Sequence, residues 1–181
     1  MIIDFNQLIT SKEYCEKTFS YFLKKKVLKQ ERGFFIKYVN KSISNLEFAN
    51  FILDEHKFSI KEKLPNKTFY DWVVTIYYYS IYHMALALLT KISYASKSHI
   101  ATITGITLFY YHKDNILNKQ DIEFLIDKIY LEKEDISLIF NSKELRETAS
   151  YNVDSLFELK QAEKMQKETA EFINKMRILL E

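Results

Sequence analysis

Arginine side chains are the first candidates for chemistry in this chain, because they are so few. Of the 26 Lys and Arg residues, only Arg32, Arg146 and Arg177 are arginine. A guanidinium group binds a phosphate or carboxylate through two parallel hydrogen bonds, a geometry that the ammonium group of lysine does not reproduce. Each arginine is therefore a candidate for anion binding, and an ordinary surface charge is the alternative for any one of them.

Arg146 is followed closely by Ser150, Tyr151 and Asn152. On a helix, side chains four residues apart share one face, so Arg146 and Ser150 lie on the same side. Tyr151 lies about 140° further round, and it meets Arg146 only where the helix ends. Since Asn152 and Asp154 are residues that typically break or cap helices, we expect the helix to end near this point.

Histidine is the side chain suited to proton transfer near neutral pH. His99 follows Lys97 and Ser98 at the expected start of a helix, where the helix dipole favours the neutral ring. A capping or packing role is the alternative for His99. His83 lies inside an apolar segment, which favours a hydrogen-bonded core histidine, and His56 and His112 are expected on the surface at helix ends.

Composition excludes several classes of site. The chain has 2 Gly, 1 Pro and a single cysteine, Cys15. Glycine-rich phosphate loops, turn-rich β-sandwiches and barrels, cysteine-based zinc sites and intramolecular disulfides are therefore excluded. No two histidines have the spacing of a metal site, so we expect no metal and no cofactor. The first residues lack the pattern of a cleavable signal, and we expect a cytoplasmic protein.

The net charge of +2 is distributed unevenly. Residues 1–67 sum to +5, residues 68–112 to +1 and residues 113–181 to −4. The run Lys24–Lys26 with Lys29 is a candidate for phosphate contacts, and a solvated helix face is the alternative.

Hydrophobic periodicity predicts helices throughout, and therefore an all-α fold. The expected architecture is an up-down bundle of four to five core helices with an extra N-terminal helix. We expect residues 1–34 to form an N-terminal helical extension and residues 35–181 to form the bundle. The charged segment 57–64 is expected to be a loop. The expected helices cover about 11–29, 35–56, 72–89, 99–111, 119–132, 134–151 and 154–181.

The segment 72–89 is apolar and aromatic with few interruptions. It approaches the length of a membrane span, but it contains four tyrosines, whose hydroxyls need partners, and His83. A helix surrounded by other helices has the same composition, and we favour this interpretation, with no membrane contact. Its tyrosines are expected to pack in the core and at a dimer surface; base stacking is the alternative.

Four short stretches resemble the HEPN domain family, in its small stand-alone form. They are residues 70–72 (YDW), 78–89 (YYSIYHMALALL), 97–99 (KSH) and 145–151 (LRETASY). The resemblance covers about residues 66–181, and the segment 35–56 fits the family's first helix. It implies a helical bundle that forms homodimers, often beside a minimal nucleotidyltransferase as a toxin–antitoxin pair. Active members of the family are metal-independent ribonucleases with an Arg followed, after four to six residues, by a His.

This chain departs from that signature, because Tyr151, Asn152 and Val153 occupy the positions where the His is expected. An asparagine does not act as a general base, and a tyrosine titrates far above neutral pH. The resemblance therefore implies an RNA- or nucleotide-binding module of a toxin–antitoxin or defence system. On this interpretation the residues expected to bind the RNA or nucleotide are Arg146, Ser150, Tyr151, Asn152, Lys97 and His99.

Two alternatives remain open at this stage. One is a ribonuclease toxin that uses Arg146 with His99 or Tyr151. The other is a non-catalytic adaptor or structural protein in which Arg146 only holds a helix end or a dimer contact.

Overall fold

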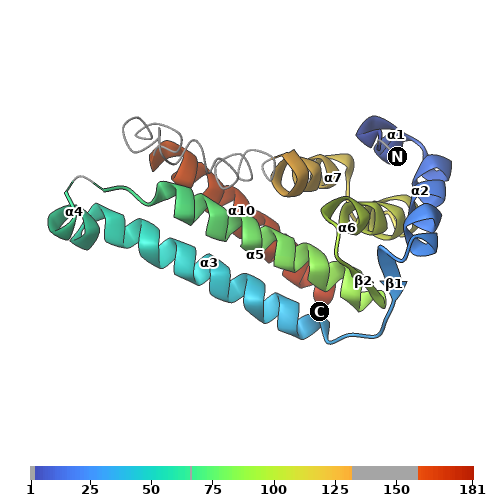
Figure 1. The fold of residues 1–181 in the computed structure, drawn as a ribbon, viewed down its shortest axis with the longest axis horizontal. Helices are drawn as coiled ribbons and strands as arrows, with labels where there is room; N and C mark the ends of the chain where they lie inside the picture. The colour runs from blue at the N-terminus through green and yellow to red at the C-terminus, as the bar shows by residue number, and fades with distance from the viewer. Residues whose placement is uncertain (1–2, 66, 132–158) are drawn as a thin grey trace. The chain divides into compact units, whose positions relative to one another are not determined.

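The computed structural model describes residues 3–65, 67–131 and 159–181. These residues are mainly helical and their sheet is limited to one two-stranded ribbon, so the prediction of an all-α fold is confirmed. The chain forms two compact units. Unit 1 comprises Met1–Tyr38 and Ala85–Lys133, and unit 2 comprises Val39–Met84 and Glu134–Glu181. Two long helices, α3 (Phe35–Lys57) and α5 (Tyr70–Lys91), contribute residues to both units (Figure 1).

Unit 1 is a set of short elements whose helices begin at capping side chains. Asp4, Ser11, Ser98 and Asn118 each accept a backbone N–H in the first turn of a helix. At Asn118 the contact is reciprocal, because Asp121 accepts the N–H of Asn118 in return. The elements are α1 (Phe5–Thr10), α2 (Lys12–Lys24), β1 (Leu28–Gln30), β2 (Tyr94–Ser96), α6 (His99–Ile106), the π-helical η1 (Thr107–Lys113), α7 (Lys119–Ile126) and the π-helical η2 (Asp127–Leu131).

The prediction of a single N-terminal helix over about 11–29 is wrong about where that helix ends. Helix α2 ends at Lys24, and Lys26 adopts a positive φ of 58° that turns the chain. The next residues form β1, which pairs with β2 in antiparallel register, with Leu28 opposite Ser96 and Gln30 opposite Tyr94. The backbone groups after α2 are thus satisfied by a distant segment of the chain rather than by another helical turn.

Two neighbouring residues of α6, Thr104 and Gly105, contact other elements of unit 1. A side chain at Gly105 would place its Cβ 2.6 Å from a terminal carbon of Leu89, so glycine permits the close approach of α5. The preceding residue, Thr104, accepts the thiol of buried Cys15 at its carbonyl, 3.6 Å away. The hydroxyl of Tyr110 donates to the carbonyl of Leu88 at 2.9 Å. These contacts join α2, α5, α6 and η1 around one core.

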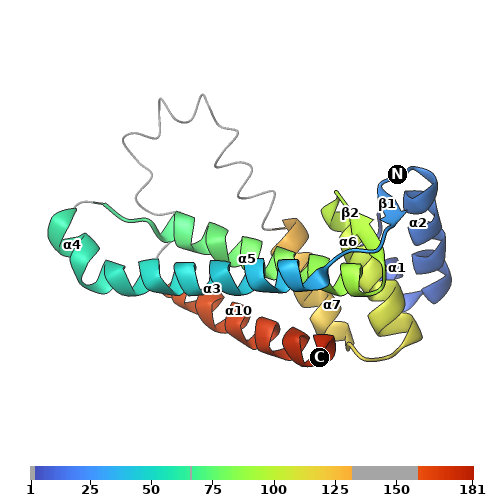
Figure 2. The same cartoon turned by 90° about the horizontal axis from the view of Figure 1, so that it is seen from below.

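Unit 2 consists of Val39–Lys57 of α3, α4 (Ser59–Lys63), Tyr70–Met84 of α5 and α10 (Leu159–Leu180). Figures 1 and 2 show α3, α5 and α10 side by side along most of their length. The prediction of a loop over 57–64 is wrong, because Ser59–Lys63 forms a short helix in which Lys61, Glu62 and Lys63 are good helix formers. The amphipathic helix expected over 154–181 is observed as α10, and residues 154–158 lie outside the described part of the chain.

Helix α5 is apolar around nearly its whole circumference. Within the described residues it is the one helix long and apolar enough to cross a membrane, and 78% of its most apolar stretch is buried inside the protein. That burial is what the core helix of a soluble protein shows. Its tyrosines differ in their surroundings: Tyr77 and Tyr78 are buried, whereas Tyr79 is 47% exposed.

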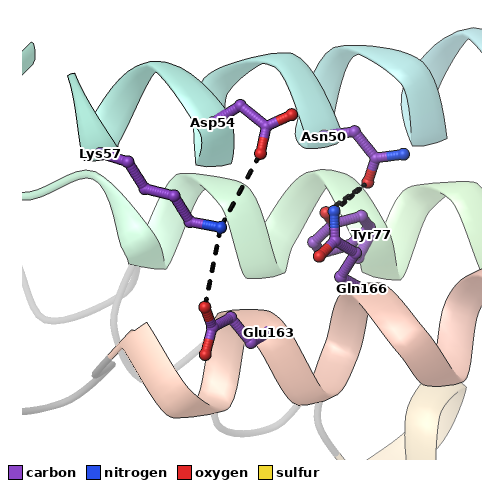
Figure 3. A network of polar contacts seen from close by, with 6 residues as sticks. All are labelled: Asn50, Asp54, Lys57, Tyr77, Glu163 and Gln166. Atoms are coloured by element: carbon purple, nitrogen blue, oxygen red, sulfur yellow. Dashed lines mark hydrogen bonds and ion pairs between the residues drawn. The ribbon is translucent and has the colours of Figure 1, made fainter. Parts of the chain in front are cut away.

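Polar side chains join the three helices of unit 2 (Figure 3). The hydroxyl of Tyr77 on α5 donates to Oδ1 of Asn50 on α3 at 2.6 Å, and Nε2 of Gln166 on α10 donates to the same oxygen at 3.0 Å. Closer to the end of α3, Nζ of Lys57 lies 3.8 Å from Glu163 and 3.9 Å from Asp54. The exposed ion pairs contribute little, whereas the shared oxygen of Asn50 links all three helices and helps to fix their register.

We predict that removing this acceptor costs more than removing one donor. Asn50→Ala leaves the Tyr77 hydroxyl without its acceptor and should lower the free energy of unfolding by about 1–3 kcal/mol, against about 1 kcal/mol for Tyr77→Phe. The double variant should lose less than the sum, because no orphaned hydroxyl remains. Urea denaturation measures all three. Asn40→Ala, at an exposed position on α3, is the control and should stay within about 0.5 kcal/mol of wild type. Strict additivity would contradict the shared-acceptor interpretation.

Candidate functional site

The six residues expected to bind RNA or a nucleotide divide into two groups. Arg146, Ser150, Tyr151 and Asn152 lie outside the described residues. Lys97 and His99 lie in unit 1, where they flank Ser98 at the start of α6. Lys97 is exposed and His99, the first residue of the helix, is half-buried.

A compact turn positions these two side chains. The hydroxyl of Ser96 donates to the carbonyl of Ser98 at 2.9 Å and accepts the N–H of Ser98 at 3.0 Å. The Ser98 hydroxyl then accepts the N–H of Ala101 and caps α6, while the Thr102 hydroxyl donates to the Ser98 carbonyl. Two serines therefore satisfy the polar backbone groups at this helix start, and the Lys97 side chain projects into solvent between them.

The β1–β2 ladder brings the lysine run of α2 to the same place. The ladder ends at the Leu28–Ser96 pair, and Lys26 and Lys97 lie two residues and one residue beyond that pair, at one end of the ribbon. Figures 1 and 2 show the two strands next to each other, beside α2 and α6. Two basic segments that are far apart in the sequence thus become neighbours.

The opposite end of the ribbon is also basic. Beyond the Gln30–Tyr94 pair, the N–H of Glu31 donates to the carbonyl of Ser93 at 2.9 Å, and Arg32 follows directly. The exposed basic side chains of the ribbon and its two ends are called the basic ribbon below. Its members are Lys24, Lys25, Lys26, Lys29, Arg32 and Lys97, all of them exposed.

The sequence identified the lysine run and Lys97 as separate candidates for phosphate binding, and it did not indicate that they lie close together. It also gave no indication that Arg32 belongs to the same surface. One signal was present: residues 24–37 and 91–99 together contain eight Lys and Arg residues but only one acidic residue, Glu31. The sequence did not indicate that β1 and β2, each only three residues long, pair with each other.

His83, in unit 2, is hydrogen-bonded as expected but only half-buried. Its Nδ1 lies 2.7 Å from the carbonyl of Tyr79 and 3.2 Å from Nδ2 of Asn45. The shorter contact to a carbonyl requires a proton on Nδ1, so Nε2 is the basic nitrogen of the neutral ring. Burial lowers the pKa of His83, and the hydrogen bond to the Tyr79 carbonyl acts in the opposite direction.

His56 lies at a helix end as expected, but the prediction that it is on the surface is wrong. Only 5% of it is exposed, because the chain entering α5 folds back over the end of α3. Its Nε2 accepts the N–H of Phe69 at 2.9 Å, and its ring lies 4.5 Å from that of Tyr70. An accepting Nε2 is unprotonated, and burial lowers the pKa of His56, opposed by the charge of Asp71.

His112 forms a further link within unit 1. It lies in the last turn of η1, half-buried, with Nε2 2.9 Å from the carbonyl of Leu8. Since a carbonyl only accepts, Nε2 carries the proton in this contact.

No group of three or more His, Cys, Asp or Glu side chains is arranged to hold a metal ion in the part of the chain that the structure describes. Comparisons with protein-family models, with curated proteins and with solved structures find no match for this chain. The functional assignment therefore depends on the residues themselves.

We predict that His56 makes the stability of the protein depend on pH. Because the folded-state pKa lies below that of the unfolded chain, the contribution of His56 is fully present above about pH 6.5. Below that pH the unfolded chain takes up the proton first, and stability falls until the pH passes the folded-state pKa. His83 acts in the same direction.

The test compares urea denaturation at about pH 7.5 and about pH 5. His56→Gln should show a smaller difference between the two pH values than wild type, although it is less stable at the higher pH. Asn40→Ala, at an exposed position that carries no titrating group, is the control and should keep the wild-type difference. An unchanged pH dependence in His56→Gln would contradict the assignment.

Proposed function

We propose that this protein is a HEPN-like module that binds RNA or a nucleotide through Arg146. In this proposal it acts as a cytoplasmic homodimer in a toxin–antitoxin or defence system, with a minimal nucleotidyltransferase as its partner. The observation that carries the proposal is the series of short sequence blocks from residue 70 to residue 151, in which the arginine is present and the histidine is missing.

The described residues support the proposal at several points. The first two blocks lie on α5, a buried helix, and the third is the capped start of α6. Long helices α3, α5 and α10 suit an up-down arrangement of the HEPN type. The turn at Ser96–Ser98 presents Lys97 to solvent, which is the environment that a phosphate contact requires.

The residues favour binding over cleavage. Arginine offers forked, permanently charged donors to a phosphate, and this needs no proton transfer and no metal. Cleavage of RNA needs a group that takes the 2′-hydroxyl proton, and the loss of a general base typically lowers the rate by about 10²–10⁴-fold. The positions after Arg146 where the family has its histidine hold no such base.

We predict that Arg146→Ala weakens binding of fluorescent single-stranded RNA or of a nucleotide about ten- to a hundred-fold, because a charge-assisted hydrogen-bond pair is lost. Arg146→Lys should restore only part of the affinity, since the ammonium group keeps the charge and loses the fork. Fluorescence anisotropy measures RNA binding, and calorimetry measures nucleotide binding.

Arg177→Ala, at an exposed arginine on α10, is the matched control and should bind like wild type. Equal affinity of wild type and Arg146→Ala, or absence of binding in both, would refute the proposal. The same samples report cleavage: RNA should stay intact. RNA degradation that depends on Arg146 and on His99 or Tyr151 would instead establish the ribonuclease alternative.

A further inference from the structure

The basic ribbon of unit 1 has a charge that sets it apart from the rest of the chain. Residues 24–37 and 91–99 sum to +7, whereas the whole chain sums to +2, so all remaining residues together sum to −5. Positive charge is therefore concentrated on a small part of the molecule. A concentrated field of one sign attracts polyanions, while a mixed surface of the same net charge does not.

The pairing of β1 with β2 spreads these basic residues along an extended surface. Its three residue pairs are about 10 Å long, with Lys26 and Lys97 beyond one end and Arg32 beyond the other. Lys29 lies between them, opposite Ala95. Because the basic groups lie at both ends of a hydrogen-bonded ribbon, they can contact different phosphates of one strand.

Aromatic side chains adjoin the basic groups at the Arg32 end. Phe34 is 74% exposed, and Nζ of Lys37 lies 5.2 Å from the centre of its ring. Nζ of Lys91 lies 5.3 Å from the ring of Phe35, so the start of α3 and the end of α5 meet there. An exposed ring beside lysines provides both stacking and phosphate neutralisation, the combination found in proteins that bind single strands.

We propose that the basic ribbon, with Phe34, binds the phosphate backbone of single-stranded RNA. This inference rests on the proposed function in taking RNA as the ligand, but it assigns a surface that does not include Arg146. The lysines and Arg32 neutralise phosphates, and the Phe34 ring stacks on an unpaired base. A duplex has no unpaired base to offer Phe34, so the surface prefers single strands.

The test measures fluorescence anisotropy with a labelled RNA of about 20 nucleotides, single-stranded or annealed to its complement, at several salt concentrations. The ribbon variant changes Lys24, Lys25, Lys26 and Lys29 to Gln. Its control changes four exposed lysines of α10 to Gln, namely Lys160, Lys164, Lys167 and Lys175. Both variants lower the net charge equally, and circular dichroism verifies that both fold.

We expect the ribbon variant to bind single-stranded RNA about a hundred-fold or more weakly near 0.1 M salt. The slope of log K against log salt should decrease in magnitude by about 3, because the variant loses four phosphate contacts and each contact on a single strand contributes about 0.7 to the slope. The α10 variant should stay close to wild type. Phe34→Ala should weaken single-strand binding about tenfold and leave duplex binding unchanged.

Two results would overturn the inference. One is an equal loss of affinity in the ribbon and α10 variants, which means that only net charge matters. The other is a ribbon variant that keeps its RNA affinity and loses binding to vesicles containing phosphatidylserine, which means that the surface faces a membrane.

Arg146→Ala, measured in parallel, separates this inference from the proposed function. If the ribbon variant loses RNA binding and Arg146→Ala retains it, the ribbon binds RNA and the assignment of Arg146 fails. If Arg146→Ala loses binding and the ribbon variant retains it, the proposed function stands and the ribbon inference fails.

Discussion

The fold depends on covering one helix that is apolar on nearly every side. Val73, Tyr77, Ile81, Met84 and Leu88 of α5 are all essentially buried. Each such side chain contributes about 1.5–3 kcal/mol when it leaves water, so no arrangement that exposes one face of α5 competes. In unit 2, α3 and α10 supply the amphipathic faces that cover it, and in unit 1 its last turns pack against α6 and η1.

Polar groups on α5 then decide how its neighbours align. Apolar packing tolerates sliding, whereas a buried hydroxyl has to meet a partner at one position. Ser80 exchanges hydrogen bonds with Ser42, and the Tyr77 hydroxyl donates to Asn50. These pairs recur along the antiparallel α3 and α5 helices, and they set the register that the hydrophobic contacts leave open.

In unit 1, the described groups suited to ligand binding are exposed rather than buried. The backbone that carries the basic ribbon is held by a short β-ladder and by two hydrogen bonds of Ser96. Its basic side chains therefore have a defined position and stay exposed to solvent. A lysine in this setting is accessible to phosphates. Arg146 and its neighbours are proposed as the specific contact, and the ribbon as the contact that is general for the phosphate backbone.

The sequence by itself determined the long helices, because hydrophobic periodicity and capping residues act within one segment. The all-α class, α3, α10 and the buried character of α5 followed from it, and Arg146, Ser150, Tyr151 and Asn152 stay predictions from sequence alone. Only the tertiary structure decided that Leu28–Gln30 pairs with Tyr94–Ser96, that His56 is buried under Phe69, and that Lys26 and Lys97 share one end of a ribbon. Three-residue strands have no period to detect, and burial at a helix end depends on where a distant segment returns.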